Sequence, residues 1–359
     1  MDNSTFANVD ELFTLHFHMD VSVDFDQKII GGSVTHDFMT ASMTDKVVLD
    51  IWDMKIESVE YMPGNSAQAM REGQSVQPLS QLEFKTYQLN PLIGETLVAQ
   101  LPGLATPNSI QSIRINYSTS PTAMALSWMT PAQTAGGKLP YLFSQCESIN
   151  CRSVAPLQDT PAIKSTYSAR IVAKNDFVVK MSANETAVNA LNETHNESFF
   201  RCDIRIPSYL MAVVVGDLEY RSLGRRVGVL TEPSLMDFVA AELDTMEELL
   251  DTAEAYLTDY IWGNYTVVVL PPSFPFGGME NPLLTFASPT IIVGDKSQVY
   301  VATHEIAHSW TGNDVTCRDW ENFWLNEGFT VFSERKVSGK IHGTDFAKVE
   351  ALLGNSTLW

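Results

Sequence analysis

The sequence predicts an α+β multidomain protein, with an all-β domain over residues 1–215 and a mixed α/β domain over residues 216–359. The chain has 359 residues, about twice the ~100–200 residues usual for one domain. In the first half, hydrophobic residues alternate with a period of two, which is typical of strands. After Gly216 the spacing changes to the period of about 3.6 that marks amphipathic helices.

The clearest strand starts at Phe13, where apolar residues occupy every second position up to Phe25. This alternation indicates a half-buried antiparallel strand. His16 and His18 share one of its faces. Because no third ligand is recognisable nearby, we interpret them as part of a solvated polar face rather than as a metal site. Further strands are expected at 47–52, 55–61, 109–117, 168–173, 177–181 and 198–206.

In the second domain, a helix of about six turns is predicted from Ser234 to Leu257, with Ser234 and Asp237 forming a start that resembles a capping box. A strand over 265–270 and helices around 297–311, 323–337 and 343–352 follow. No Lys or Arg lies between Arg226 and Lys296, whereas eleven carboxylates do. We interpret most of these as a solvated face, and the alternative is a negative field that favours cationic substrates.

The overall composition excludes some classes of protein. There are 23 Lys and Arg residues against 43 Asp and Glu, a net charge of −20, so we expect no nucleic-acid partner, because phosphate binding requires basic surface. No apolar run is long enough to cross a membrane, and residues 1–15 lack the basic start of a secretory signal. A soluble, cytoplasmic protein is therefore expected, with its four cysteines reduced and its seven N-x-S/T sites irrelevant unless the chain is secreted.

A metal site is predicted by the H-E-x-x-H segment that begins at His304. Residues four apart on a helix lie on one face, so His304 and His308 can reach one ion, which zinc suits best. Glu305 would then lie beside the ion, where a carboxylate can deprotonate a water. Taken alone, so short a pattern also occurs by chance on amphipathic helices.

A third ligand makes the metal reading more specific. Glu327 follows His308 after 18 intervening residues, enough for one helix to end and a second to present a carboxylate. Two His and one Glu with an open fourth position are typical of a catalytic zinc site. Glu334 lies seven residues later, on the same helical face, and could hydrogen-bond a ligating imidazole. Its alternative is a surface ion pair with Arg335 or Lys336.

Upstream, Gly277 and Gly278 open a segment that reads G-G-M-E-N and follows a strand. Two glycines allow close backbone approach, so this segment could be an edge on which a peptide adds as a strand. Glu280 could pair there with a free α-ammonium group. By itself the segment is equally consistent with a turn.

These motifs together resemble the M1 zinc aminopeptidases. The resemblance rests on G-G-M-E-N at 277–281, the zinc helix, and N-E-G at 326–328. Within the family, the leukotriene A(4) hydrolase and aminopeptidase B branch matches best, through P-P-S-F-P at 271–275, H-S-W-T-G-N at 308–313 and F-W-L-N-E-G at 323–328. The segments at 140–146 and 158–161 extend the likeness into the β-rich half.

The resemblance implies an all-β saddle-like N-terminal domain and a thermolysin-like (gluzincin) catalytic domain. The latter is expected to be incomplete, because the family's C-terminal helical domain has no counterpart here. The resemblance also implies the roles of individual residues. One Zn²⁺ per chain would be bound by His304, His308 and Glu327. Glu305 would be the general base, and the substrate would contact Glu280, Gln145, Gly277, Gly278 and Met279.

The sequence departs from the branch at three places. Glu147 stands where the leukotriene branch is expected to carry Gln. The Glu147 carboxylate would strengthen capture of an ammonium group and repel a fatty-acid carboxylate. Phe276 stands where that branch usually has Tyr. No Tyr follows Tyr300, so the family's transition-state tyrosine has no counterpart in this sequence. A missing oxyanion donor typically costs ~10²–10³ in turnover, so we expect this chain alone to be a weak catalyst that still binds zinc.

Three functional hypotheses follow. The first is a zinc aminopeptidase acting on peptides with a free N-terminus, with Glu280 and Glu147 binding the amine. The second is hydrolysis of a lipid epoxide, which the resemblance permits and Glu147 disfavours. The third is a zinc-bearing chain that binds peptides or a partner without turning them over. No membrane partner is expected.

Overall fold

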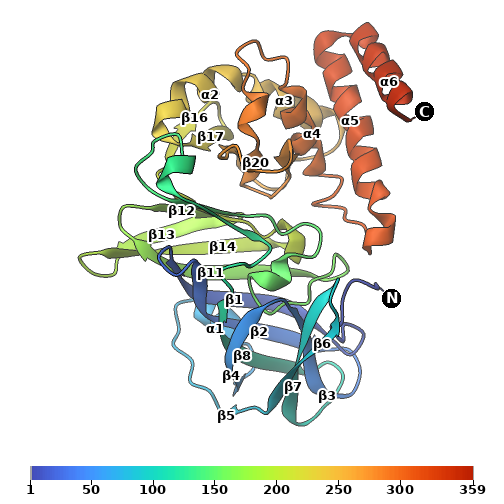
Figure 1. Cartoon of the computed structure of the whole chain (residues 1–359). Coiled ribbons are helices and arrows are strands. Elements are labelled where there is room, and N and C mark those ends of the chain that lie inside the picture. Colours follow the sequence, from blue (N-terminus) through green and yellow to red (C-terminus); the bar gives the residue numbers. More distant parts are fainter. Residues whose placement is uncertain (1, 359) are drawn as a thin grey trace. The chain divides into compact units, whose positions relative to one another are not determined.

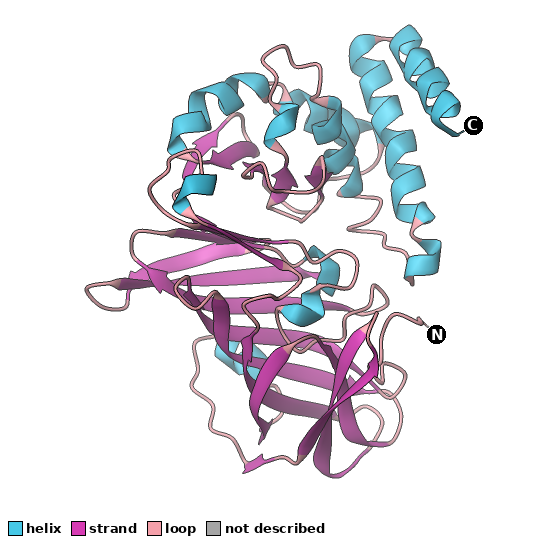
Figure 2. Ribbon diagram, viewed as in Figure 1, coloured by secondary structure: helices cyan, strands magenta, loops and turns pink. Residues whose placement is uncertain are grey.

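The structure is a computed structural model that describes residues 2–358 (Figure 1). The chain divides into two compact units, which are described separately. Unit 1 contains Met1–Thr130, Pro140–Gly216 and Arg318–Trp320, and unit 2 contains Pro131–Leu139, Asp217–Cys317 and Glu321–Trp359. Unit 1 is built from strands and unit 2 carries most of the helices (Figure 2).

The largest sheet of unit 1 has eight strands in the order β13-β14-β11-β1-β2-β8-β4-β5. Along the chain these strands are β1 (Leu12–Asp24), β2 (Ile29–Thr40), β4 (Met54–Met62), β5 (Ser80–Gln81), β8 (Ile110–Thr119), β11 (Lys164–Lys174), β13 (Asn184–Ala190) and β14 (His195–Pro207). The short helix α1 (Ser66–Arg71) packs against β1 and β2. Val34, Phe38 and Ile113 of the eight-stranded sheet are among the buried core residues of unit 1.

Two smaller sheets complete unit 1. One contains β3 (Thr44–Ile51), β7 (Gly94–Ala105) and β6 (Phe84–Asn90), and the other contains β12 (Val178–Met181), β15 (Val213–Gly216), β10 (Tyr141–Ser144) and β9 (Leu126–Met129). The predicted strands are confirmed as β1, β3, β4, β8, β11, β12 and β14. The all-β character of this half is therefore correct.

Two expectations about β1 were wrong in part. The strand is antiparallel to β2 but parallel to β11. His16 and His18 are only 3% and 8% exposed. They lie on an inner strand of the sheet, and helix α1 packs against that strand. Each imidazole lies within hydrogen-bond distance of the Ser168 hydroxyl on β11, at 3.0 and 2.9 Å. Burial lowers the pKa of His16 to about 3 and that of His18 to about 4.

Unit 2 contains a five-stranded sheet in the order β16-β17-β18-β20-β19, with helices packed around it. The strands are β16 (Glu219–Ser222), β17 (Val227–Thr231), β18 (Tyr265–Val269), β19 (Gly278–Met279) and β20 (Thr285–Ala287). The helices are α2 (Met236–Glu242), α3 (Met246–Tyr256), α4 (Tyr300–His308), α5 (Trp324–His342) and α6 (Thr344–Leu358). The strand expected over 265–270 and the three expected C-terminal helices are confirmed.

The single long helix predicted over 234–257 is instead the pair α2 and α3, and no side-chain hydrogen bond caps the start of α2. The break follows Glu242, whose buried carboxylate accepts the backbone N–H groups of Val293, Gly294 and Lys296. This contact ties the end of α2 to the 293–296 loop. The residues after it, Asp244 and Thr245, favour turns over helix interiors.

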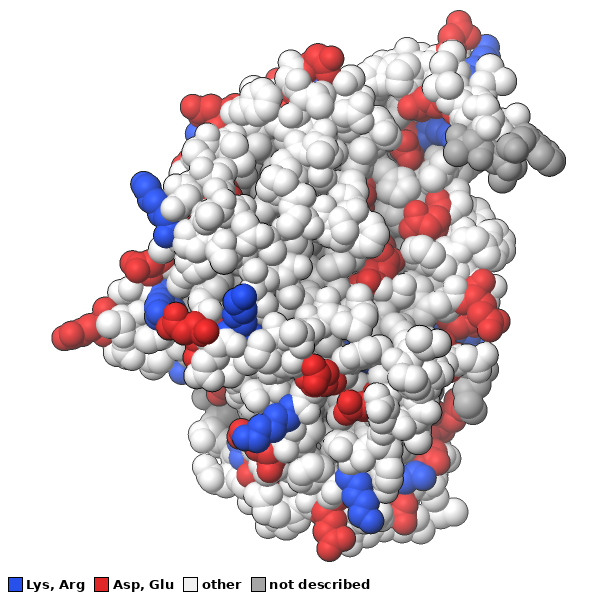
Figure 3. All heavy atoms as spheres, viewed as in Figure 1, with Lys and Arg blue, Asp and Glu red and all other residues white. Residues whose placement is uncertain are grey.

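Eight of the eleven carboxylates of this region are exposed or half-buried, as expected for most of them, and the other three, Glu232, Glu242 and Glu280, are buried. Glu232 and Glu242 are buried and accept backbone N–H groups, whereas Asp251 and Glu254 pair with Arg226. On the face drawn in Figure 3, acidic and basic side chains stand beside one another at several places. Among the described residues, no helix combines the length and apolarity needed to cross a membrane.

Candidate metal and catalytic site

Helices α4 and α5 carry the residues of the predicted metal site. Ile306 and Ala307 are fully buried in α4, which packs against α3, α5 and β19. His304 and His308 lie on the face directed at α5, because residues four apart are stacked on one side of a helix. Glu327, in the first turn of α5, faces both histidines.

The hydrogen bonds of the two histidines fix which nitrogen is available for a metal. His304 Nδ1 donates to Glu334 Oε2 at 2.9 Å, and His308 Nδ1 donates to the carbonyl oxygen of Thr311 at 2.9 Å. With Nδ1 as the donor, each neutral imidazole directs the lone pair of Nε2 to the other side of its ring. Of the two interpretations of Glu334, the hydrogen bond to the His304 imidazole is the one that the structure shows.

The remaining ligand atoms converge on one point. His304 Nε2 lies 3.0 Å from His308 Nε2, and the Glu327 carboxylate lies 3.4 Å from the first nitrogen and 3.5 Å from the second. Ligands at about 2.0–2.1 Å from a tetrahedral zinc are about 3.3–3.4 Å apart. Two nitrogen lone pairs that face each other so closely need a proton or a metal ion between them. The donor set present therefore fits one zinc ion.

Electrostatics in the site favour a positive charge. Burial lowers the pKa of His304, but its hydrogen bonds to the Glu327 and Glu334 carboxylates, with the nearby charges of Glu305 and Glu334, together outweigh burial and raise the pKa to about 10. For Glu327, burial acts to raise the pKa, while the His304 hydrogen bond and the two imidazoles lower it overall. Both shifts show that the site holds an excess of negative charge that a cation would neutralise.

Glu305 lies beside these ligands without being one of the converging three. Its side chain is 5% exposed, and Oε2 has no hydrogen-bond partner within the described protein. Burial, with the nearby charges of Glu280 and Glu327, raises the pKa of Glu305 well above its ordinary value, although His304 opposes the change. A carboxylate held in this way is suited to accept a proton from a water at the metal.

Gly278 and Met279 form an edge strand, β19, in the segment for which the sequence suggested one. β19 pairs with β20, Gly278 opposite Ala287, and is the last strand of its sheet. A Cβ at Gly278 would overlap the Glu305 carboxylate, so a larger residue there would displace that side chain. Gly277 and Met279 flank this position, and Met279 is buried. The outer side of β19 is the edge on which an extended peptide could add.

Glu280 follows β19 and is 4% exposed. Its Oε1 lies 3.8 Å from His308 Nδ1 and has no hydrogen-bond partner within the described protein. The Asn313 side-chain amide donates to the Glu280 backbone carbonyl at 2.7 Å. Glu280, Glu305 and His308 form a second set of possible ligands, but His308 Nδ1 is already engaged by Thr311. The set of His304, His308 and Glu327 is therefore favoured.

Gln145 and Glu147 belong to unit 1, in the loop after β10. Gln145 is 9% exposed, and its backbone N–H donates to the Ala125 carbonyl at 2.8 Å. Their contact with substrate stays a prediction. Phe276, the position where the related branch usually carries Tyr, is 49% exposed.

Three supporting residues were not predicted from the sequence. Thr330 and Thr311 hold His308, since the Thr330 hydroxyl donates to the Thr311 carbonyl at 2.8 Å. Asn313 fixes Glu280. Asn313 lies in the H-S-W-T-G-N segment already singled out, which was the available signal. Thr330 gave none, because a threonine inside an amphipathic helix has no distinctive pattern.

Comparisons with known proteins agree with the resemblance noted in the sequence. A family model described as the Peptidase M1 N-terminal domain matches residues 13–210, and one described as the Peptidase family M1 domain matches residues 241–357. Two curated proteins are 38% identical: "Leukotriene A-4 hydrolase" of Xenopus laevis, over 98% of this chain and 56% of that protein, and "Leucine aminopeptidase 2" of Yarrowia lipolytica, over 99% and 52%.

Solved structures are similar as well. Yeast LTA4 hydrolase in complex with bestatin superposes with a TM-score of 0.88 at 35% identity, covering 99% of this chain and 53% of that one. An M1 zinc metallopeptidase mutant from Deinococcus radiodurans has a TM-score of 0.72 at 19% identity, which shows a shared fold. The chain thus spans about half the length of the curated relatives it matches.

Proposed function

Because this chain belongs to peptidase family M1, we propose that it is a zinc aminopeptidase, which hydrolyses the first peptide bond of substrates that have a free amino terminus. The observation that carries the proposal is the convergence of His304 Nε2, His308 Nε2 and Glu327 within 3.0–3.5 Å of one another. The orphaned carboxylate of Glu305 lies beside them.

In the proposed mechanism, His304, His308 and Glu327 would hold one zinc ion, which would supply Lewis acidity to the scissile carbonyl and to the attacking water. Glu334 and Thr311 keep the two imidazoles in the tautomer that leaves Nε2 free. Glu305 accepts the proton of the water through Oε2 and then delivers it to the leaving amine. The outer edge of β19 aligns the peptide.

Selectivity for the amino terminus is proposed to come from Glu280, with Glu147 and Gln145 as further contacts. The Glu280 carboxylate is buried and its Oε1 is unpaired within the described protein. A buried carboxylate without a partner is costly, and an ammonium group would satisfy it. This arrangement would bind a charged α-amine and reject an acylated one.

Hydrolysis of a lipid epoxide is the second candidate. It is favoured by the 38% identity to a protein named leukotriene A-4 hydrolase and disfavoured by the extra carboxylate at Glu147, which would repel a fatty-acid carboxylate. The third candidate, zinc and peptide binding without turnover, uses the same residues. We keep residues 1–215 and 216–359 as the proposed functional domains. A cytoplasmic location is proposed because none of the four cysteines forms a disulfide among the described residues.

The test uses the zinc-loaded chain with an amino-acid amide and its N-acetylated form. Calorimetry should show binding of the free amide alone, and only the free amide should be hydrolysed. Glu305→Gln should keep zinc and ligand binding while losing turnover. Hydrolysis of the acetylated amide at a comparable rate would refute the aminopeptidase assignment. Binding of the free amide without turnover would favour the third candidate.

A further inference from the structure

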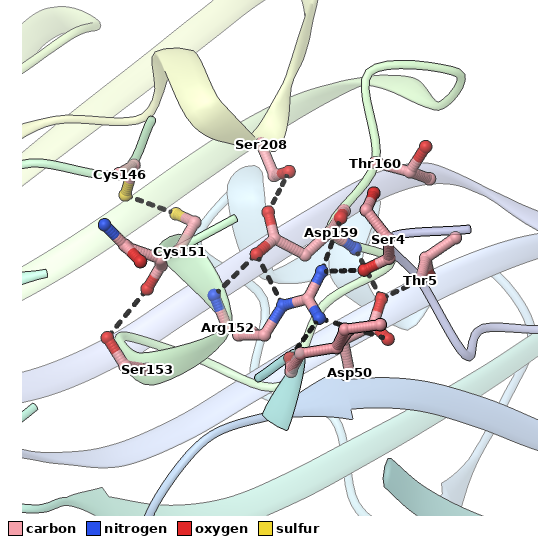
Figure 4. Close-up of polar contacts among 12 residues, drawn as sticks. Ser4, Thr5, Asp50, Cys146, Cys151, Arg152, Ser153, Asp159, Thr160 and Ser208 are labelled. Carbon is pink, nitrogen blue, oxygen red and sulfur yellow. Dashed lines mark hydrogen bonds and ion pairs between the residues drawn. The ribbon is translucent and has the colours of Figure 1, made fainter. Parts of the chain in front are cut away.

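The two cysteines of the loop after β10 lie against one another inside unit 1. Figure 4 shows the two side chains directed at one another, with Cys146 Sγ 2.6 Å from Cys151 Sγ. The two residues are 3% and 0% exposed. That separation is shorter than ordinary non-bonded contact between sulfur atoms, while a disulfide bond is about 2.05 Å long. Both cysteines are free thiols in this structure.

The backbone holds both cysteines where they are. The Cys146 carbonyl accepts the Asn150 N–H at 2.8 Å, which closes the loop between them. Cys151 begins a short 3-10 helix whose Ser153 hydroxyl donates to the Asn150 carbonyl at 2.7 Å. These hydrogen bonds fix the backbone of the loop that carries the two cysteines.

Next to Cys151, Arg152 fixes the far end of the loop. Its guanidinium is fully buried and donates to the Asp159 carboxylate at 3.0 Å, the Ile93 carbonyl at 2.6 Å and the Ser4 carbonyl at 2.7 Å. Figure 4 shows it between Asp159 and Ser4. An arginine with this many partners does not shift without breaking them. The backbone beside Cys151 is therefore held in place, and the sulfur atoms, 2.6 Å apart, need to approach by only about 0.5 Å to reach bonding distance.

We propose that Cys146 and Cys151 form a reversible intramolecular disulfide, whose closure restrains the segment that carries Gln145 and Glu147. Glu147 lies inside the ring that the bond would close, and Gln145 is the residue before it. Any consequence for substrate binding rests on the proposed function of these two residues. The disulfide itself does not.

With a peroxide as oxidant, the chemistry balances. Cys146 sulfur attacks one peroxide oxygen, the O–O bond breaks, and a sulfenic acid and one water result. Cys151 sulfur then displaces the hydroxyl from Cys146, forming the S–S bond and a second water. Two thiols lose two electrons and two protons, and the peroxide is reduced. Burial raises the pKa of Cys151 well above its ordinary value, so this oxidation should be slow.

Peptide mapping tests the bond directly. The full chain is treated with hydrogen peroxide, denatured, alkylated and digested with trypsin, which releases residues 139–152 with both cysteines. We expect this peptide to be unalkylated and lighter by two hydrogen atoms, and dithiothreitol should restore two alkylation sites. Recovery of Cys146 and Cys151 as two alkylated thiols, or as separate sulfinic acids, would overturn the proposal.

Serine variants test whether the cross-link requires Cys146 and Cys151 in particular. Cys146→Ser and Cys151→Ser should each abolish the cross-link, whereas Cys202→Ser should leave it intact. Cys202 is a matched control because it is also buried, on β14, and its thiol donates to the Ile204 carbonyl at 3.3 Å. If a serine variant does not fold, peptide mapping of the parent chain still decides whether the disulfide forms.

A second readout concerns the substrate segment. The affinity of the zinc-loaded chain for an amino-acid amide should differ at least about threefold between the reduced and cross-linked forms. Equal affinity in the two forms would overturn the claim that closure restrains this segment. Absence of amide binding in both forms would refute the proposed function, and it would leave the mapped disulfide standing.

Discussion

Removal of the Glu334 carboxylate should weaken zinc binding, although Glu334 is not one of the three converging ligands. The residue lies on α5, and its side chain is 11% exposed and bonded to His304 Nδ1 at 2.9 Å. This bond fixes the tautomer and the ring orientation of His304. Without it, Nε2 would point at the metal for only part of the time.

The size of the effect follows from this geometry. Loss of a carboxylate behind a metal-bound histidine typically reduces affinity 10–100-fold, or about 1.4–2.7 kcal/mol. Glu334→Ala removes both the charge and the acceptor and should reach this range. Glu334→Gln keeps an acceptor oxygen within reach of Nδ1 and should lose less. The expected order of affinity is parent, then Gln, then Ala.

Competition with a chromophoric zinc chelator measures these affinities. Asp345→Asn is the matched control, since that carboxylate is 92% exposed at the start of α6 and should leave zinc affinity unchanged. Circular dichroism checks that each variant is folded. Equal zinc affinity for the parent and Glu334→Ala would refute the view that this hydrogen bond orients His304.

Three further predictions concern other parts of the chain. Gly278→Ala should keep zinc but lose amide hydrolysis at least about 10-fold, because the new methyl group would displace the Glu305 carboxylate; unchanged turnover would contradict this. Arg152→Met should destabilise the fold by about 3–5 kcal/mol in urea unfolding, because buried Asp159 loses its partner; a loss below about 1 kcal/mol would contradict this. Burial lowers the pKa of His36 from 6.5 to about 4. The contribution of the neutral imidazole to the free energy of unfolding is therefore complete above pH 6.5 and declines as the pH falls towards 4. His36→Gln should therefore lose about 2 kcal/mol less stability than the parent between pH 7 and pH 5, and identical pH profiles would refute this.

Sequence patterns predicted those parts of the molecule that depend on local spacing. Alternation identified β1 and six other strands, and the H-E-x-x-H spacing placed two imidazoles on one face of α4. Hydrophobic alternation did not predict β2, because Gly31 and Gly32 interrupt the apolar pattern of that strand. β7 was missed as well, since Pro102 and Gly103 lie within it.

Features that depend on tertiary contacts were not predictable in this way. The break between α2 and α3 follows from Glu242 binding a loop some fifty residues away in sequence. His16 and His18 are buried because β11 and α1 surround them, which alternation along one strand cannot reveal. The role of Thr330 depends in the same way on a contact with Thr311, which lies outside α5.

The most direct test of the account is the zinc content of the purified chain by elemental analysis. The account predicts about one zinc per chain, a large loss in Glu327→Ala, and no loss in the control Asp345→Asn. Zinc content that is the same in Glu327→Ala and in the parent, at matched concentration and after the same dialysis, would contradict the site built from His304, His308 and Glu327.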